Sequence, residues 1–443
     1  MIYLLFIVLA IMLIILFKIN KYDITSPAIV FIFGFVFQAA WAMAYAEKWE
    51  LGLHLNTFLT ITLGTLEFAV VCLLIKYIFS KKKKKEEPAH LDIIKIANWK
   101  EIIYLVCISG FTVLYLYLVV KAVDGSFNSL SSISDAIAKF DKYSKFTDSF
   151  EVVRMPFLVS NIRTAIIASG YWFGYVILNN FIVNKKVKVL EVIIYIVTMI
   201  LSVLSGSRTP AFMMIVALIA YFVILKAKNN NYKTNIDFKV IRNIAIIGVV
   251  FVATFVSFGN LLGRNVQTKP VDYLAIYIGA EVKNLDLFLQ EKDTYAKNEI
   301  FASQTLKPLV ETYGKKIGFK GYKEYRLDLP FRSVKGNNLG NVYTTFYPYV
   351  YDFGYLGVAI FVFIMAAISQ VVYEFIRRTN MKLTPQISIL MYGIIFGCLL
   401  LSFFSNKFYE TITNLNFIKS IVTWLLCNLF FVKLFNTKKK ENI

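Results

Sequence analysis

Charged residues are scarce in this sequence, and neither end carries a recognisable soluble domain. Asp, Glu, Lys and Arg together account for 17% of the 443 residues and hydrophobic residues for 58%, whereas soluble domains have about 25% charged residues. Apolar runs of about 17–25 residues, the length that crosses a hydrocarbon core, recur along the whole chain. The composition excludes an ordinary soluble enzyme and predicts an all-α polytopic integral membrane protein.

Cysteine and histidine are also scarce. The four cysteines lie in apolar runs and form no CxxC pair, so they indicate neither a disulfide framework nor a metal site. The two histidines are His54 and His90, and the HExxH, Walker and GxSxG motifs are absent. We therefore expect no metal and no cofactor. We expect any general base on the outer surface to be a carboxylate.

Positive charge, by contrast, is plentiful. The net charge is +20, but much of the excess stands in short clusters beside apolar runs. Lipid headgroups and membrane orientation explain such clusters better than nucleic acid does. The run "KKKKKEE" that starts at Lys81 marks a cytoplasmic loop by the positive-inside rule. Counting outward from it predicts about eleven spans, near residues 2–18, 27–46, 57–79, 101–120, 157–182, 189–205, 210–226, 243–259, 349–375, 386–404 and 416–434.

This count places every short basic cluster on the cytoplasmic side and three larger segments outside. The outer segments are residues 121–155, the turn "SGSRT" and the long stretch 260–345. Residues 2–18 lack both a preceding basic region and a cleavage site, so we expect a retained first span with its N-terminus outside. The predicted organisation is an N-terminal transmembrane bundle over 1–259, an extracytoplasmic loop over 260–345 and a C-terminal transmembrane bundle over 346–443.

The long outer loop has features of a functional, substrate-binding surface. In "YLAIYIGAEVKNLDLFL", apolar residues recur at spacings of three and four, which predicts an amphipathic helix lying in the membrane interface. A loop of more than about 15 residues without obvious strands is more often functional than a plain cap.

Arg208 is the most informative single residue. It follows the small residues of "LSGSRTP", and Pro210 starts the next apolar helix. A guanidinium beside a helix N-terminus would favour an anion together with the backbone N–H groups. The alternative is an ordinary turn residue. Because the guanidinium fork binds phosphate bidentately and keeps its proton, a diphosphate is the expected ligand.

Four other arginines are candidate substrate-binding residues. Arg163 lies several residues inside an apolar run, where a charge normally faces a polar cavity or a partner; the alternative is snorkelling to the outer headgroups. Arg154, on the approach to the same span, is either a site residue or an interfacial anchor. Arg264 and Arg332 stand near the two ends of the long loop.

The segment from Asn341 into the next span supplies aromatic and acidic candidates. Tyr347 and Tyr349 offer ring faces on which sugars can pack, and Asn341 offers an amide for sugar hydroxyls. The alternative for each tyrosine is the aromatic belt of the membrane interface. Asp352, at the mouth of the span, is the preferred catalytic base and Glu281 the second catalytic candidate. Two further acidic residues were weighed for this role: Asp286 and Glu311.

These motifs resemble the Wzy-type polymerases of O-antigen and capsular polysaccharide, also called oligosaccharide repeat unit polymerases. The likeness is carried by "LSGSRTP", "IYIGAEVKNLDLFLQ" and "NVYTTFYPYVYDFGYLGV", in that order and on the same predicted side. The hydropathy layout extends the resemblance over essentially the whole chain.

The resemblance implies a metal-independent membrane glycosyltransferase. Such an enzyme moves a growing glycan from undecaprenyl diphosphate onto a new lipid-linked repeat unit, outside the bacterial cytoplasmic membrane. It also implies that Arg208 and Arg264 bind the diphosphate, and that the chain-length regulator and the flippase of the same pathway are candidate partners. The related O-antigen ligases use an outer-face histidine that we could not place in this sequence. Two alternatives stay open, a translocase of lipid-linked oligosaccharide and a ligase-like glycosyltransferase.

Overall fold

The computed structural model describes residues 1–81, 91–124, 133–145, 153–230, 270–291, 301–317, 329–379 and 383–433, and these residues are almost entirely helical. Eight of the described helices are long and apolar enough to cross a membrane. They are α1 (Ile2–Ile19), α2 (Pro27–Ala44), α3 (Leu55–Ser80), α4 (Asn98–Asp124), α6 (Phe157–Asn184), α8 (Thr209–Asn229), α13 (Phe346–Arg378) and α16 (Leu415–Cys427), which continues into a short π-helical stretch, η2 (Asn428–Lys433).

Two shorter apolar helices, α7 (Val189–Val203) and α14 (Ile387–Leu400), accompany the eight long ones. Together the ten helices coincide with the spans predicted from the sequence, except the span near residues 243–259, which lies outside the described residues. The prediction of a polytopic, all-helical membrane protein is confirmed.

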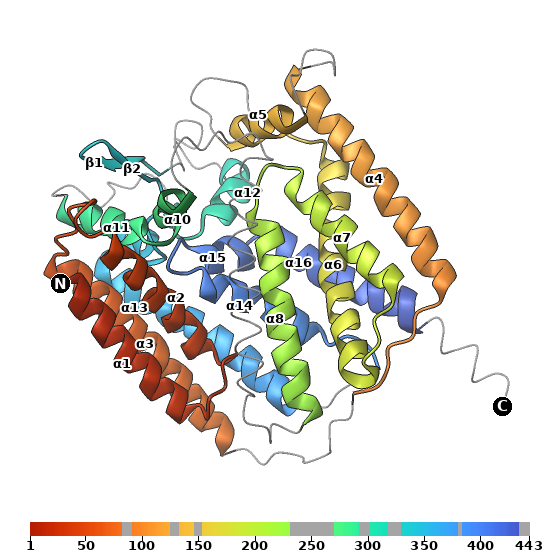
Figure 1. Cartoon of the computed structure of the whole chain (residues 1–443), viewed down its shortest axis with the longest axis horizontal. Coiled ribbons are helices and arrows are strands. Elements are labelled where there is room, and N and C mark those ends of the chain that lie inside the picture. The colour runs from red at the N-terminus through yellow and green to blue at the C-terminus, as the bar shows by residue number, and fades with distance from the viewer. Residues whose placement is uncertain are drawn as a thin grey trace. The chain divides into compact units, whose positions relative to one another are not determined.

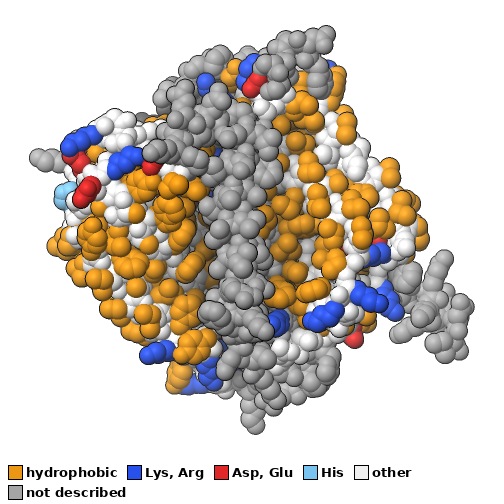
Figure 2. Space-filling model, in the orientation of Figure 1, with side chains coloured by type: hydrophobic (Ala, Val, Ile, Leu, Met, Phe, Trp, Pro, Cys, Tyr) orange, Lys and Arg blue, Asp and Glu red, His pale blue; other side chains and the backbone are white. Residues whose placement is uncertain are grey.

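The surface of each unit suits a bilayer. On α1, for example, the side chains of Ile7, Ile11 and Ile14 are 51%, 52% and 57% exposed. Figure 2 shows hydrophobic side chains over the middle of each unit and charged side chains toward its two ends. Contiguous exposed apolar surface of this kind marks contact with a membrane.

The chain divides into two compact units. Unit 1 comprises Met1–Lys85, Thr268–Arg378 and Ile395–Phe417, and unit 2 comprises Glu86–Gln267, Thr379–Ile394 and Ile418–Ile443. Two of the boundaries between the units fall inside helices, one in α14 and one in α16. The linear division into bundle, loop and bundle stays a prediction.

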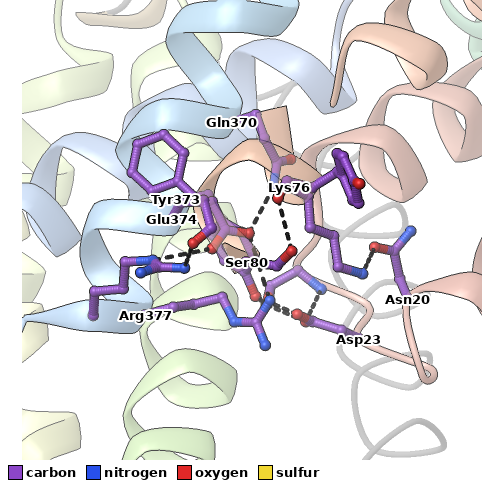
Figure 3. Close-up of polar contacts among 12 residues, drawn as sticks. Asn20, Asp23, Lys76, Ser80, Gln370, Tyr373, Glu374 and Arg377 are labelled. Atoms are coloured by element: carbon purple, nitrogen blue, oxygen red, sulfur yellow. Dashed lines mark hydrogen bonds and ion pairs between the residues drawn. The ribbon is translucent and has the colours of Figure 1, made fainter. Parts of the chain in front are cut away.

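In unit 1, helices α1, α2, α3 and α13 pack side by side (Figure 1). Polar contacts tie their ends together, as Figure 3 shows. The Tyr373 hydroxyl on α13 donates to Asp23 in the α1–α2 connection at 2.5 Å, and Lys76 on α3 donates to Asn20 at 2.7 Å. Among the described residues, Lys18, Lys81 and Arg377 belong to basic clusters that the sequence assigned to the cytoplasm, and they stand at these ends of α1, α3 and α13.

The opposite end of unit 1 is covered by parts of the long loop. Helices α10 (Pro270–Ile278) and α11 (Ala280–Gln290) follow each other and pack on α2, and α11 also contacts α3. A small core of Trp49, Ala275, Ala280 and Leu339 joins them to the α2–α3 connection. The single interfacial helix expected here is two helices, and α11 is buried on nearly every side.

A short antiparallel hairpin also belongs to this end, although the sequence showed no obvious strand. Strands β1 (Arg332–Val334) and β2 (Asn337–Gly340) pair with Val334 opposite Asn337. The two residues between them, Lys335 and Gly336, both have positive φ, of 46° and 75°. Such a turn matches the twist of a hairpin, which explains strands this short. Helices α12 (Lys307–Ile317) and α15 (Lys407–Ile412) complete unit 1.

In unit 2, α6 packs against both α7 and α8, and α4 packs against α7 and against α5 (Ile133–Lys145). Ion pairs and lysine hydrogen bonds gather at one end. Lys188 at the start of α7 contacts the Glu101 carboxylate of α4 at 2.6 Å, and Lys228 at the end of α8 donates to the Thr379 carbonyl at 2.7 Å. At the other end lie α5 and the turn that contains Arg208.

Candidate functional site

The turn between α7 and α8 has the shape that its small residues predicted. Gly206 has φ of 81° and donates its N–H to the Val203 carbonyl at 2.8 Å. Helix α5 packs closely on the turn, because a Cβ atom at position 206 would collide with the Asp141 side chain. Glycine is therefore needed here both for the backbone conformation and for the approach of α5.

Arg208 is the last residue before α8, as expected from Pro210. It is 8% exposed. Helix α5 packs against the same turn, at Gly206. An arginine in this enclosed place acts in a lower effective dielectric than one on the surface, which strengthens its attraction for an anion.

Arg163 reaches the same turn from α6. Its Nη2 donates to the Ser202 carbonyl at 2.9 Å and to the Ser205 hydroxyl at 2.9 Å, and its guanidinium lies 5.3 Å from the Tyr115 ring centroid. Its Nε is buried without a hydrogen-bond partner, and no carboxylate pairs with it among the residues that the structure describes. Arg163 thus braces the turn and, among the described residues, brings to it a positive charge that no carboxylate pairs with.

The other two arginines predicted near this end differ. Arg154 is exposed, shortly before α6 begins. Arg264 lies outside the described residues. Within unit 2, the structure therefore brings Arg163 and the Arg208 turn together and leaves Arg154 on the surface.

In unit 1, Asp352 is firmly anchored. Its carboxylate accepts the backbone N–H of Thr305 at 2.6 Å and that of Gln304 at 3.1 Å, and the Ser303 hydroxyl lies 3.4 Å away. These bonds fasten the first two turns of α13 to the segment that precedes α12 and fix the orientation of the carboxylate.

The segment that bears Asp352 is separated from the long part of α13 by a break at Gly354. Gly354 has φ of 66° and ψ of −161°, inside what is otherwise continuous helix. This combination is essentially restricted to glycine. The break lets the first turns of α13 take their own direction, which positions Asp352 against residues 303–305.

Tyr349 belongs to a buried hydrogen-bond network rather than to an exposed sugar platform. Its hydroxyl donates to Asn406 Oδ1 at 3.1 Å and shares a hydrogen bond of 2.9 Å with Thr345. Asn406 in turn donates to the Thr305 carbonyl at 2.8 Å. The network therefore connects Tyr349 to the segment that holds Asp352.

Tyr347 and Arg332 are linked through Tyr343. The ring centroids of Tyr347 and Tyr343 are 4.6 Å apart, and Tyr347 also packs against Phe288 at 4.4 Å. Arg332 Nε donates to the Tyr343 hydroxyl at 2.9 Å, and its guanidinium pairs with Glu291. Hydrogen bonding to Glu291 raises the pKa of Arg332, so its charge is retained. Tyr347 is buried and Arg332 half-buried.

Glu281 is enclosed in unit 1. Its side chain is 0% exposed, and its Oε2 accepts from Gln38 Nε2 on α2 at 3.4 Å, while Oε1 has no hydrogen-bond partner among the described residues. Burial raises the pKa of the Glu281 carboxyl well above its ordinary value. The group is thus held in its protonated, neutral form more readily than an exposed glutamate.

Helix α11 carries other buried polar side chains that join it to its surroundings. Asn284 donates to the carbonyls of Leu339 and Val342 at 3.0 and 2.9 Å, and Lys283 donates to the Glu50 carbonyl at 2.8 Å. Asn341, half-buried, lies between the two residues that Asn284 binds. The buried polar side chains of the motif "AEVKNLDLFL" therefore fasten α11 to the α2–α3 connection and to the segment after β2.

His54 is a residue whose surroundings the sequence did not reveal. Its ring Nδ1 lies 3.0 Å from the Asp286 Oδ2 of α11. The two residues are 232 positions apart, so no local pattern could have joined them. From the sequence, Asp286 is only a candidate base, and the preference for a carboxylate base follows from the scarcity of histidine and of catalytic motifs.

Comparison with known proteins gives the family. The chain matches the O-antigen polysaccharide polymerase Wzy family over residues 1–272, a range that includes Arg163 and Arg208 and ends before α11. Searches of curated proteins and of solved structures found no match. The match covers more than half of the sequence, and the helices, the buried arginine turn and the polar cap are those of a multi-pass membrane protein. The chain therefore belongs to the O-antigen polysaccharide polymerase Wzy family, a family of bacterial membrane polysaccharide polymerases.

Proposed function

We propose that the chain transfers a growing glycan from undecaprenyl diphosphate onto a new lipid-linked repeat unit at the outer face of the cytoplasmic membrane. Family membership supplies the class of reaction, repeat-unit polymerisation. The observation that carries the finer proposal is the partly buried Arg163, which has no carboxylate partner among the described residues and braces the turn of Arg208.

An uncompensated cation inside a protein is costly unless a counter-charge arrives. A lipid diphosphate supplies that charge, and the leaving diphosphate gains more negative charge as the glycosidic bond breaks. Arg208, beside the N-terminus of α8, would stabilise this developing charge. Because α5 covers the turn, the proposal requires α5 to shift when the substrate binds. Arg154, Arg264 and Arg332 stay candidate ligands for the glycan or its phosphates.

The acceptor sugar also needs a base. Asp352 and Glu281 stay candidates from the sequence, but their surroundings favour other roles. Asp352 is anchored by backbone N–H groups, and Glu281 is enclosed with a raised pKa. Tyr347, Tyr349 and Asn341 stay candidate sugar contacts, the tyrosines requiring exposure of rings that are buried here.

The test compares Arg208 variants in cells that depend on this enzyme for surface glycan. Arg208→Ala should cut polymerisation by about 10²–10³-fold, the loss expected for one oxyanion-type donor, and should leave single repeat units on the lipid. Arg208→Lys should also be impaired, because lysine keeps the charge without the fork. Lys142→Ala removes one exposed positive charge from α5 and should leave glycan length unchanged.

Three outcomes separate the possibilities when glycan length and lipid-linked units are measured by gel. Accumulated single units at the outer leaflet support the proposal. Loss of units from the outer leaflet would indicate a translocase and contradict it. Long chains at normal abundance in Arg208→Ala would remove Arg208 from the site. Elongation by purified protein in liposomes, supplied only with lipid-linked repeat units, tests the activity itself.

A further inference from the structure

Asp286 of α11 and the residues that open α3 form a compact arrangement. The carboxylate Oδ1 accepts the His54 backbone N–H at 2.9 Å and the Thr57 hydroxyl at 2.7 Å, and Oδ2 lies 3.0 Å from the His54 Nδ1. The Asp286 side chain is 0% exposed, whereas that of His54 is 54% exposed. A fixed, buried carboxylate therefore holds an imidazole whose ring reaches the surface.

This contact determines the form of the imidazole. Because the carboxylate only accepts hydrogen bonds, Nδ1 carries the proton of the neutral ring and Nε2 keeps its lone pair. An imidazole that a buried carboxylate holds in one tautomer is the arrangement by which enzymes prepare a histidine as a general base.

The imidazole is not needed for anchoring. The backbone N–H of His54 and the Thr57 hydroxyl would fasten Asp286 to the start of α3 with any side chain at position 54. Two carboxamides belong to the same junction of α3 and α11: Gln290, one turn after Asp286, donates to Asn56 Oδ1 at 2.8 Å, and Asn56 donates to the Leu289 carbonyl. Carboxamides can donate to and accept from sugar hydroxyls, so this surface suits an acceptor saccharide.

We propose that His54, oriented by Asp286, is the general base of the polymerisation reaction; this rests on the proposed function. His54 Nε2 takes the proton of the acceptor hydroxyl while that oxygen bonds to the anomeric carbon of the donor glycan. The bond from the anomeric carbon to the lipid diphosphate breaks, and the diphosphate leaves with the electron pair. The imidazolium then returns its proton to water. Asp286 acts as a positioning residue.

The decisive variant is His54→Asn, because the asparagine Nδ2 can replace Nδ1 as a donor to Asp286 but offers no second nitrogen. With purified protein in liposomes that contain lipid-linked repeat units, kcat should fall by about 10²–10⁴-fold. The KM for the repeat unit and the thermal unfolding temperature should stay near those of the wild type. His54→Ala should regain part of its rate when free imidazole is added. Glu47→Gln, which changes an exposed side chain in the α2–α3 connection, should keep kcat within a few-fold.

Each result decides one claim. A normal rate in His54→Asn, with Arg208→Ala inactive, overturns the role of His54 and leaves the proposed function standing. A loss in Asp352→Asn that added formate restores in part, together with a normal His54→Asn, returns the base to Asp352. A wild-type protein that does not elongate lipid-linked units at all contradicts the proposed function instead.

Discussion

At the scale of single residues, the tertiary contacts and burial of each candidate side chain determine its properties more than its position in the sequence does. In the sequence, Arg208 and Arg163 are charges near a membrane boundary. In the structure, α5 packs on the turn that precedes Arg208, and Arg163 donates to the Ser202 carbonyl at the end of α7. Asp352 and Glu281 show the same effect, since one is fixed by backbone N–H groups and the other is sealed against α2.

Glu281 gives a prediction for the dependence of stability on pH. Because its folded-state pKa lies above the ordinary 4.5, the folded protein binds this proton more tightly than the unfolded chain does. The contribution to stability is therefore full below about pH 4.5 and is lost as the pH rises through the raised value. Glu281→Gln keeps a neutral side chain of the same shape, so it should be at least as stable as the wild type at alkaline pH.

The measurement is the thermal unfolding temperature of purified protein from acidic to alkaline pH. The wild type should lose stability with rising pH over a range where Glu281→Gln does not. Glu47→Gln, an exposed glutamate in the same cap, should behave as the wild type does. Identical slopes in the wild type and Glu281→Gln would show that the carboxyl is not the source of the dependence.

At the scale of elements, breaks and turns position the candidate groups. The break at Gly354 lets the first turns of α13 carry Asp352 to residues 303–305, and the turn at Gly206 lets α5 lie over Arg208. The motif helix α11 supplies Asp286 to α3 on one side and Glu281 to α2 on another. Asp286 and Glu281 are five residues apart on one helix, and they differ in their hydrogen bonds because they face different helices.

Gly354→Ala tests the break in α13 directly. No atom would meet the added Cβ within 4 Å, so any cost comes from the backbone conformation alone and should be about 1–3 kcal/mol. Glycan chains should also shorten, because Asp352 and its partners move with the first turns of α13. The control is Gly110→Ala in α4, where the added methyl is equally unobstructed and alanine favours the helix. Equal unfolding temperatures in the two variants would rule out a conformational role for Gly354.

At the scale of the whole molecule, the two units share one pattern. Each has an end where described basic residues that the sequence assigned to the cytoplasm lie, such as Arg377 in unit 1 and Lys188 and Lys228 in unit 2. Each has an opposite end with candidate site residues. This separation is the one expected from the positive-inside rule.

The orientation is open to a labelling experiment in intact cells, in a background without the exposed Cys107. Cysteine at Ser207 or Asn337 should react with an impermeant thiol reagent, and cysteine at Lys83 or Lys186 should react only after the membrane is opened. Labelling of Lys83 in intact cells would reverse the orientation and put the candidate sites on the cytoplasmic face.

The sequence by itself determined the class of protein, the spans and the family, because membrane crossing depends on the length and composition of local runs. Hydrocarbon thickness sets that length, and basic clusters orient each run, so no distant contact is needed to predict them. The "SGSRTP" turn was predictable for the same reason. Its glycine and proline specify the turn and the start of α8 locally.

Only the tertiary structure decided which candidate groups are enclosed, anchored or paired. Asp141 of α5 packs against Gly206, 65 positions later in the chain, and the His54–Asp286 contact joins residues 232 positions apart. The pKa, the tautomer and the accessibility of a side chain depend on such neighbours. The local sequence does not show which residues these neighbours are. The roles of these charges therefore follow from the packing of the helices and not from the pattern of residues along the chain.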